Sequence, residues 1–198
     1  YGVFLHGSIN WLSDDRVLPM HSDVDVMVVL EGSDSPLKLG KFIYHDVLLE
    51  VSYLSRDEIK SPEMILGQYH LAGSFQGPSI LLDPSGQLTR LQRAVARDYA
   101  KRQWVFKRCQ HARNKILYGY KRLDEVEAFH DQVLAWLFPT GVTTHVLLVA
   151  GLENPTVRKR YLKVRSLLAD YGYTDFYELL LELLGCAQMK REEVEDHL

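Results

Sequence analysis

The chain has 198 residues, of which 46% are hydrophobic and 25% charged, with a formal net charge of −3 and two cysteines. This composition excludes a disordered chain and a disulfide-stabilised miniprotein, and the length allows one or two buried cores. The negative net charge disfavours a dedicated nucleic-acid binder. No run of eighteen consecutive apolar residues occurs, so we expect no membrane span and a cytoplasmic protein.

Charge is unevenly distributed along the chain. Residues 1–88 contain 12 acids and 5 Lys or Arg, and residues 89–198 contain 14 acids and 18 Lys or Arg. The two parts therefore carry net charges of −7 and +4, which add up to −3. This asymmetry predicts an acidic module over 1–88 and a basic module over 89–198 with different roles.

The first predicted elements are strands that present carboxylates. The β-type run at 1–6 ends at a Gly-Ser pair, and Asp23 and Asp25 introduce an apolar run at 26–30. Residues two apart on a strand point to the same side, so the two aspartates are expected to project together and Val24 and Val26 to enter the core. Glu50 offers a third carboxylate from the apolar run at 47–53. Clustered carboxylates in a partly buried place require a cation, and hard oxygen ligands suit Mg²⁺.

The following elements are mostly helical. A capping box stands at 55–58, a Ser-Pro pair at 61–62 is expected to open a helix that runs toward Gly73, and residues 79–83 read as a strand. One long helix is predicted over 88–117, and later helices over 123–138 (closed by proline), 143–152, 155–171 and 174–184. The fold class is therefore α+β: a small mixed sheet at 1–88, then an all-α bundle at 89–198.

The Gly-Ser pair, the Asp-Val-Asp stretch and the later acid together resemble the DNA polymerase β-like nucleotidyltransferase superfamily. The 14 residues between Ser8 and Asp23 form a longer gap than that family usually has, which indicates an inserted loop. A helix normally precedes the first strand in this family, so we expect further residues before the first one here. The resemblance covers 1–88 and implies that Asp23, Asp25 and Glu50 bind two Mg²⁺ ions. It also implies that Gly7 and Ser8 bind the phosphates of the NTP, and that Ser22 either binds a phosphate or orients Asp23.

The helical part is similar in layout to the antibiotic nucleotidyltransferases of the aminoglycoside and lincosamide type. In those enzymes an acid four residues before a lysine commonly acts as general base, and the comparable pair here is His111 and Lys115. Histidine suits the role because its pKa lies near neutrality, although a plain surface position stays an alternative. Asp131 and Glu127, expected on the next helix, are the substitutes, and Lys115 would neutralise the triphosphate.

The function expected is transfer of an NMP from an NTP to a hydroxyl of a small-molecule acceptor, with release of pyrophosphate. One alternative is transfer to an RNA end, suggested by a basic stripe of Arg90, Arg93, Arg97 and Lys101 on one helix face. Another is a non-catalytic nucleotide-binding regulatory relative. The expected partners are the NTP and the acceptor, nucleic acid is disfavoured, and a homodimer is left open.

Overall fold

The computed structural model describes residues 1–13, 15–18, 22–32, 34, 36–155 and 157–196. It contains both strands and helices, which confirms the α+β class. The described residues divide into two compact units, Tyr1–Arg108 and Cys109–Leu198. This division comes later along the chain than the functional boundary predicted after residue 88.

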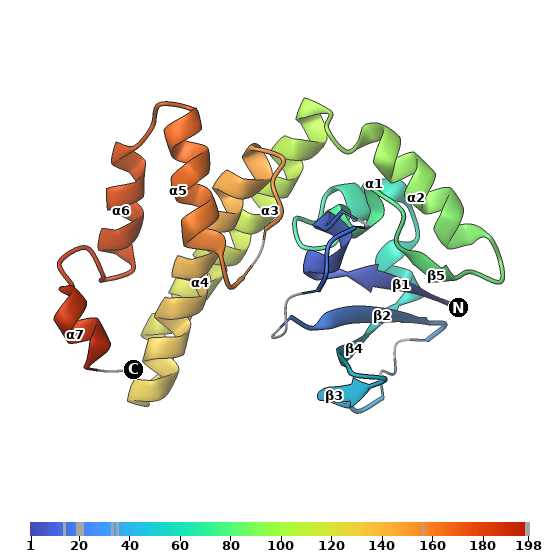
Figure 1. The fold of residues 1–198 in the computed structure, drawn as a ribbon, viewed down its shortest axis with the longest axis horizontal. Coiled ribbons are helices and arrows are strands. Elements are labelled where there is room, and N and C mark those ends of the chain that lie inside the picture. The colour runs from blue at the N-terminus through green and yellow to red at the C-terminus, as the bar shows by residue number, and fades with distance from the viewer. Residues whose placement is uncertain (14, 19–21, 33, 35, 156, 197–198) are drawn as a thin grey trace. The chain divides into compact units, whose positions relative to one another are not determined.

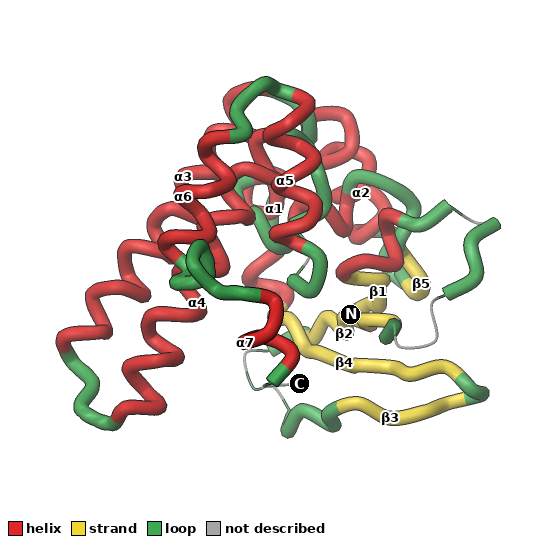
Figure 2. The backbone as a smooth tube through the Cα atoms, turned by 60° about the vertical axis from the view of Figure 1, so that its left-hand side comes forward, coloured by secondary structure: helices red, strands yellow, loops and turns green. Residues whose placement is uncertain are grey.

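The first unit contains a five-stranded mixed sheet of order β3-β4-β2-β1-β5 (Figure 1). The strands are β1 (Gly2–His6), β2 (Val24–Leu30), β3 (Lys41–Tyr44), β4 (Val47–Ser55) and β5 (Ile80–Leu82). β2 and β4 run parallel, and the other neighbouring pairs are antiparallel. Figure 2 shows β3 beside β4, at one edge of the sheet. The two-residue turn between them, with positive φ at His45 and Asp46, suits a tight hairpin.

The hydrophobic core of this unit lies on one face of the sheet. Phe4, Val29 and Leu54 contribute fully or almost fully buried side chains from β1, β2 and β4. Helices α1 (Pro62–Leu66) and α2 (Gln87–Asp98) pack on them, together with the start of α3 (Arg102–Lys121). Both predicted starts after β4 are confirmed: Ser55 forms a capping box, and the Ser61 hydroxyl accepts a hydrogen bond from the third residue of α1. The expected extent of this helix toward Gly73 was wrong, because α1 ends at Leu66.

The core face is the face that carries Asp25, because Met27 and Val29 follow it at two-residue steps and belong to the core. The prediction that Val24 and Val26 enter the core was therefore wrong, since both lie half-buried on the other face. In the run after the aspartates, the side chains on both faces of the strand are apolar. Alternation alone therefore could not predict which face the helices cover.

The predicted single helix over 88–117 is interrupted between Asp98 and Arg102. The buried guanidinium of Arg108 donates to the backbone oxygen of Tyr99 (2.8 Å) and to that of Leu66 (3.3 Å). It also lies over the Tyr99 ring, 4.2 Å from its centroid. A carbonyl released by the helix break thus has a long-range donor, which a helical pattern in the sequence does not reveal.

The second unit is helical. It holds the rest of α3, then α4 (Phe129–Ala150), α5 (Arg160–Asp170), α6 (Asp175–Leu183) and α7 (Arg191–Glu195). Leu148, Val164 and Leu168 form a core between α4 and α5, against which α6 packs. The predicted helices at 155–171 and 174–184 correspond to α5 and α6, with α5 beginning later than expected.

The prediction that Pro139 closes one helix and that another begins at 143 was wrong, because α4 continues through the proline. The proline ring packs against Gly119 on α3, where a Cβ atom would lie 2.9 Å from it. The hydroxyls of Thr140 and Thr144 donate to backbone oxygens one turn earlier. Packing on a glycine of another helix thus offsets the lost backbone donor.

Helix α4 is long and apolar enough to cross a membrane by length and composition, and 44% of its most apolar stretch is buried inside the protein. Core helices of soluble bundles meet the same criteria, and the packing of α4 on α5 is of that kind. The structure is therefore compatible with a soluble protein, and the expected absence of a membrane span stays a prediction.

Candidate metal centre

Three carboxylates from two neighbouring strands converge at one end of the sheet. Asp25 on β2 and Glu50 on β4 are register partners in the parallel pair. Asp23 lies directly before β2 rather than on it. One oxygen from each of the three carboxylates lies within 4.8 Å of the others. The predicted convergence of these acids is confirmed, whereas the prediction that Asp23 shares a strand with Asp25 was wrong.

The register of the strands explains the convergence. Glu50 pairs with Lys41 on its other side, and Asp25 pairs with His6. Four ionisable residues therefore form one row across β3, β4, β2 and β1. Two residues further along, the row is Met27 with Phe4 and Ser52. The same face of the sheet is thus charged at one end and apolar beneath the helices, which places the acids at the border of the core.

Burial and charge act together on Asp25. Its pKa is raised to about 6, first by burial and then by the negative charges of Asp23 and Glu50. Lys38 and Lys41 oppose this rise. The pKa of Glu50 is lowered, mainly by its hydrogen bond with Lys38. A cluster whose central carboxylate resists ionisation lacks positive charge, and a divalent cation would supply it.

Two lysines contact the carboxylates directly. Lys38 Nζ lies 2.5 Å from Glu50 Oε1, and Lys41 Nζ lies 3.4 Å from Glu50 Oε2. Lys41 also donates a hydrogen bond to Asp23. Sequence reasoning missed both lysines because β3 was not predicted, so nothing placed Lys41 opposite Glu50. A short run of aromatic and β-branched residues, Phe42 to Tyr44, followed by a two-residue turn was the available signal.

Gly7 makes room for Asp25. Its φ is +72°, and a Cβ atom built there would lie 2.3 Å from Asp25 Oδ2. Ser8 is exposed in the following turn, and Ser22 is half-buried beside Asp23. The preceding His6 contacts the hydroxyl of Ser74 through Nδ1 (2.7 Å), and its pKa is lowered by burial. The phosphate-binding roles of Gly7, Ser8 and Ser22 stay predictions.

The residues present fit a hard divalent cation. All three donors are carboxylates, which Mg²⁺ and Mn²⁺ prefer, and their mutual distance suits shared coordination. Each of the three residues offers one carboxylate oxygen to a shared ion. Acidic groups also gather on protein surfaces without a metal, so the half-burial of all three is the more telling feature.

The residues predicted from the helical part lie in the second unit. His111 is half-buried on α3, and its pKa is lowered by burial and then by the nearby charge of Lys115. Asp131 is exposed on α4, whereas Glu127 precedes that helix, so its predicted helical position was wrong. The general-base assignment, and the triphosphate role of Lys115, stay predictions.

The basic stripe predicted on one helix face does not form as a single surface. Lys101 lies in the break between α2 and α3 rather than on α2. The Asp98 carboxylate pairs with Arg97 at 3.0 Å and with Lys101 at 2.7 Å, which lowers the pKa of Asp98 to about 2. Asp98 thus contacts two of the four cations and offsets one positive charge, so the feature that suggested RNA binding is weakened.

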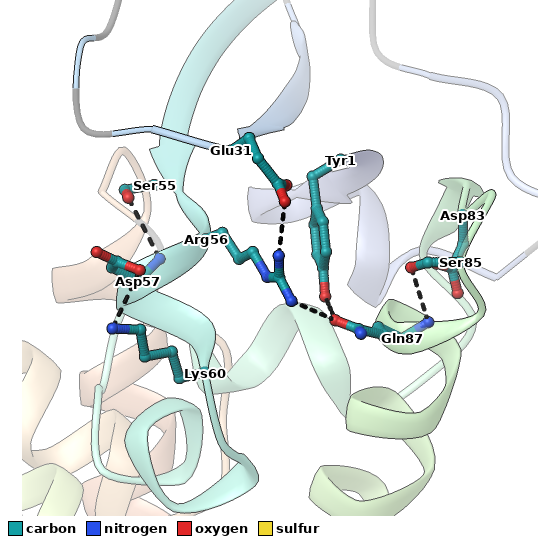
Figure 3. A network of polar contacts seen from close by, with 9 residues as sticks. All are labelled: Tyr1, Glu31, Ser55, Arg56, Asp57, Lys60, Asp83, Ser85 and Gln87. Carbon is teal, nitrogen blue, oxygen red and sulfur yellow. Dashed lines mark hydrogen bonds and ion pairs between the residues drawn. The ribbon is translucent and has the colours of Figure 1, made fainter.

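A cavity of about 600 Å³ lies at the opposite end of β2 and β4, where Glu31 and Arg56 follow the two strands. Figure 3 shows Arg56 pointing between the Glu31 carboxylate (2.6 Å) and the Gln87 side chain. Nearby, Lys60 pairs with Asp57 at 3.1 Å. These charged side chains of the wall already form ion pairs with one another. The cavity therefore attracts a charged ligand less strongly than the carboxylate cluster does.

No family model matches the chain, and no curated protein is similar to it in sequence. A functional assignment therefore depends on the arrangement of the residues themselves.

Proposed function

We propose that this protein is a metal-dependent nucleotidyltransferase. The observation that supports this most is the convergence of Asp23, Asp25 and Glu50 from a parallel pair of strands. Gly7, with a φ of +72°, lets the backbone approach the Asp25 carboxylate closely, as the Gly-Ser pair of the resembling family requires. Carboxylates in this number and spacing suit two divalent ions, the arrangement used for in-line phosphoryl and nucleotidyl transfer.

In the proposed reaction, an acceptor hydroxyl attacks the α-phosphorus of the NTP. A new P–O bond forms to the acceptor, and the bond to the bridging oxygen of pyrophosphate breaks. Asp23, Asp25 and Glu50 would hold the divalent ions. Bound there, the ions supply activation of the hydroxyl and charge stabilisation of the leaving group. His111 takes the hydroxyl proton in this scheme.

The acceptor we favour is a small molecule in the cytoplasm. The sheet-bearing part has a net charge of −7 over residues 1–88, which opposes a long polyanionic acceptor. Arg97 and Lys101 are engaged by Asp98, which leaves less of the helix face for a phosphate backbone. Strong RNA binding at physiological salt would instead favour the RNA-end alternative.

The test is metal- and nucleotide-dependent stabilisation, followed by turnover. Mn²⁺ with an NTP should raise the melting temperature of the wild type, because ligands that bind the native state alone stabilise it. Asp23→Asn combined with Asp25→Asn should abolish this rise. Glu178→Gln combined with Glu182→Gln, two exposed acids on α6, is the matched control and should keep it. An equal rise in both double variants would place the ligands elsewhere.

Turnover distinguishes an enzyme from a nucleotide-binding relative. α-labelled NTPs, Mg²⁺ or Mn²⁺ and a panel of hydroxylated small molecules should yield a labelled adduct and pyrophosphate in equal amounts. Stabilisation without any adduct, across small molecules and RNA, would favour the non-catalytic alternative.

A further inference from the structure

Lys38 and Lys41 reach the carboxylate cluster from one short segment. Lys41 begins the edge strand β3, and Lys38 stands three residues earlier in the exposed stretch at 36–40. Their side chains are 52% and 43% exposed, whereas those of Asp23 and Glu50 are 13% and 22% exposed. The two ammonium groups therefore cover the carboxylates on the more solvent-accessible side of the cluster.

The ammonium groups and a divalent ion would compete for the same oxygens. Lys38 contacts Glu50 Oε1, and Lys41 contacts Glu50 Oε2 and Asp23 Oδ2. Mg²⁺ binds carboxylate oxygens at about 2.0–2.1 Å and requires a near-octahedral shell around itself. An ammonium group that keeps its present place occupies part of that shell. Metal binding at these oxygens consequently requires both lysines to move aside.

The local backbone and side chains permit such a movement. Gly40 has a φ of +73° and no atom within 4 Å of its Cβ direction, so the segment before Lys41 is not held by packing there. Each lysine has a flexible four-carbon stem. If each ammonium group moves by a few ångströms, it stays near the cluster but no longer contacts the carboxylate oxygens. Phosphate oxygens of a metal-bound nucleotide would then be within reach of both ammonium groups.

We propose that Lys38 and Lys41 contact the phosphates of the nucleotide. When metal and nucleotide bind, the two lysines leave the carboxylates and form ion pairs with the triphosphate instead. This inference depends on the proposed function. In the metal-free protein the lysines offset part of the repulsion among three carboxylates. In the complex they face the β- and γ-phosphates, where negative charge accumulates as pyrophosphate leaves.

The experiment measures binding by titration calorimetry, with no turnover needed. Lys38→Met combined with Lys41→Met removes both charges and keeps most of the side-chain length. For Mn²⁺ alone, the double variant should bind about threefold to tenfold more tightly, since half-exposed ion pairs no longer compete. For Mn²⁺ with a non-hydrolysable α,β-methylene NTP, it should bind the nucleotide about tenfold more weakly.

Lys60→Met is the control, because Lys60 is exposed and pairs with Asp57 away from the cluster. It should leave both affinities at the wild-type value. The inference is overturned if the double lysine variant lacks either change, or if the control shows the same pair of changes. A different result would contradict the proposed function itself. If the wild type and the Asp23→Asn/Asp25→Asn variant bind Mn²⁺ and nucleotide equally well, both proposals are overturned.

Discussion

Asp25 and Glu50 are direct register partners on adjacent parallel strands, with Asp23 one step before β2 completing the cluster. The pair lies at the border between the charged end and the buried part of one sheet face. This position accounts for the raised pKa of Asp25, since burial is its largest cause and neighbouring carboxylates add to it. The site is therefore short of positive charge before any ligand binds.

Asp25→Asn should stabilise the metal-free protein at pH 7.5. The pKa of Asp25 is raised to about 6, so its ionised form costs folding free energy at any pH above that value. Because the residue is partly exposed to solvent, which screens these charges, we expect a gain of about 1 kcal/mol. The gain should shrink as the pH falls from 7.5 to 4.5, since the wild-type carboxyl becomes protonated on the way. Urea unfolding at both pH values measures it, and Glu182→Gln should show no such trend.

Affinity for Mn²⁺ should fall with pH below about 6. A proton on Asp25 must leave before the carboxylate can bind metal, so the dissociation constant should rise about tenfold per pH unit below that value. Above pH 7 the affinity should be nearly constant. Calorimetric titrations between pH 5 and 8 provide the measurement. An affinity that is unchanged across this range would contradict Asp25 as a ligand.

Gly7→Ala should weaken metal binding by displacing Asp25. A Cβ atom at Gly7 would lie 2.3 Å from Asp25 Oδ2, and the positive φ adds backbone strain of about 1 kcal/mol. Gly172→Ala is the matched control, because its φ is +74° and nothing lies near its Cβ direction. Both variants should lose similar stability from backbone strain, and Gly7→Ala alone should bind Mn²⁺ about tenfold more weakly.

His111→Ala should reduce turnover with little change in nucleotide affinity. A general base contacts the acceptor, and its loss typically costs about 10²–10⁴ in rate. The lowered pKa of His111 keeps the ring neutral at pH 7, so the acidic limb of the wild-type rate profile should lie below the ordinary pKa range of histidine. Full turnover in this variant, with loss in Asp131→Asn or Glu127→Gln, would transfer the role to that residue.

Arg108→Met should destabilise the first unit by about 2–4 kcal/mol. It removes a buried cation whose guanidinium donates to the backbone oxygens of Leu66 and Tyr99, and leaves those acceptors buried. Arg113→Met, at an exposed position on the same helix, should change the free energy of unfolding by less than about 0.5 kcal/mol. Urea unfolding followed by Trp fluorescence distinguishes the two. Equal effects would mean that the helix break does not depend on Arg108.

Local pattern was sufficient for several features of this chain. The alternation around Asp25 and the apolar surroundings of Glu50 placed both residues on strands of one sheet. The capping box at Ser55 and the apolar stripe of α6 were likewise readable, because each is encoded within a few residues of sequence.

Tertiary contacts decided the rest, because they join residues far apart in the chain. Arg108 donates to the backbone oxygen of Tyr99 at the break that divides the helix expected over 88–117. Gly119 accommodates the ring of Pro139, so the helices expected over 123–138 and 143–152 are one helix, α4. The covering helices determine that the core lies on the Asp25 face rather than the Val24 face. The pairing of β3 with β4 brings Lys41 to Glu50. Strand alternation specifies two faces and a spacing, whereas burial and counter-charge depend on which elements pack against each face.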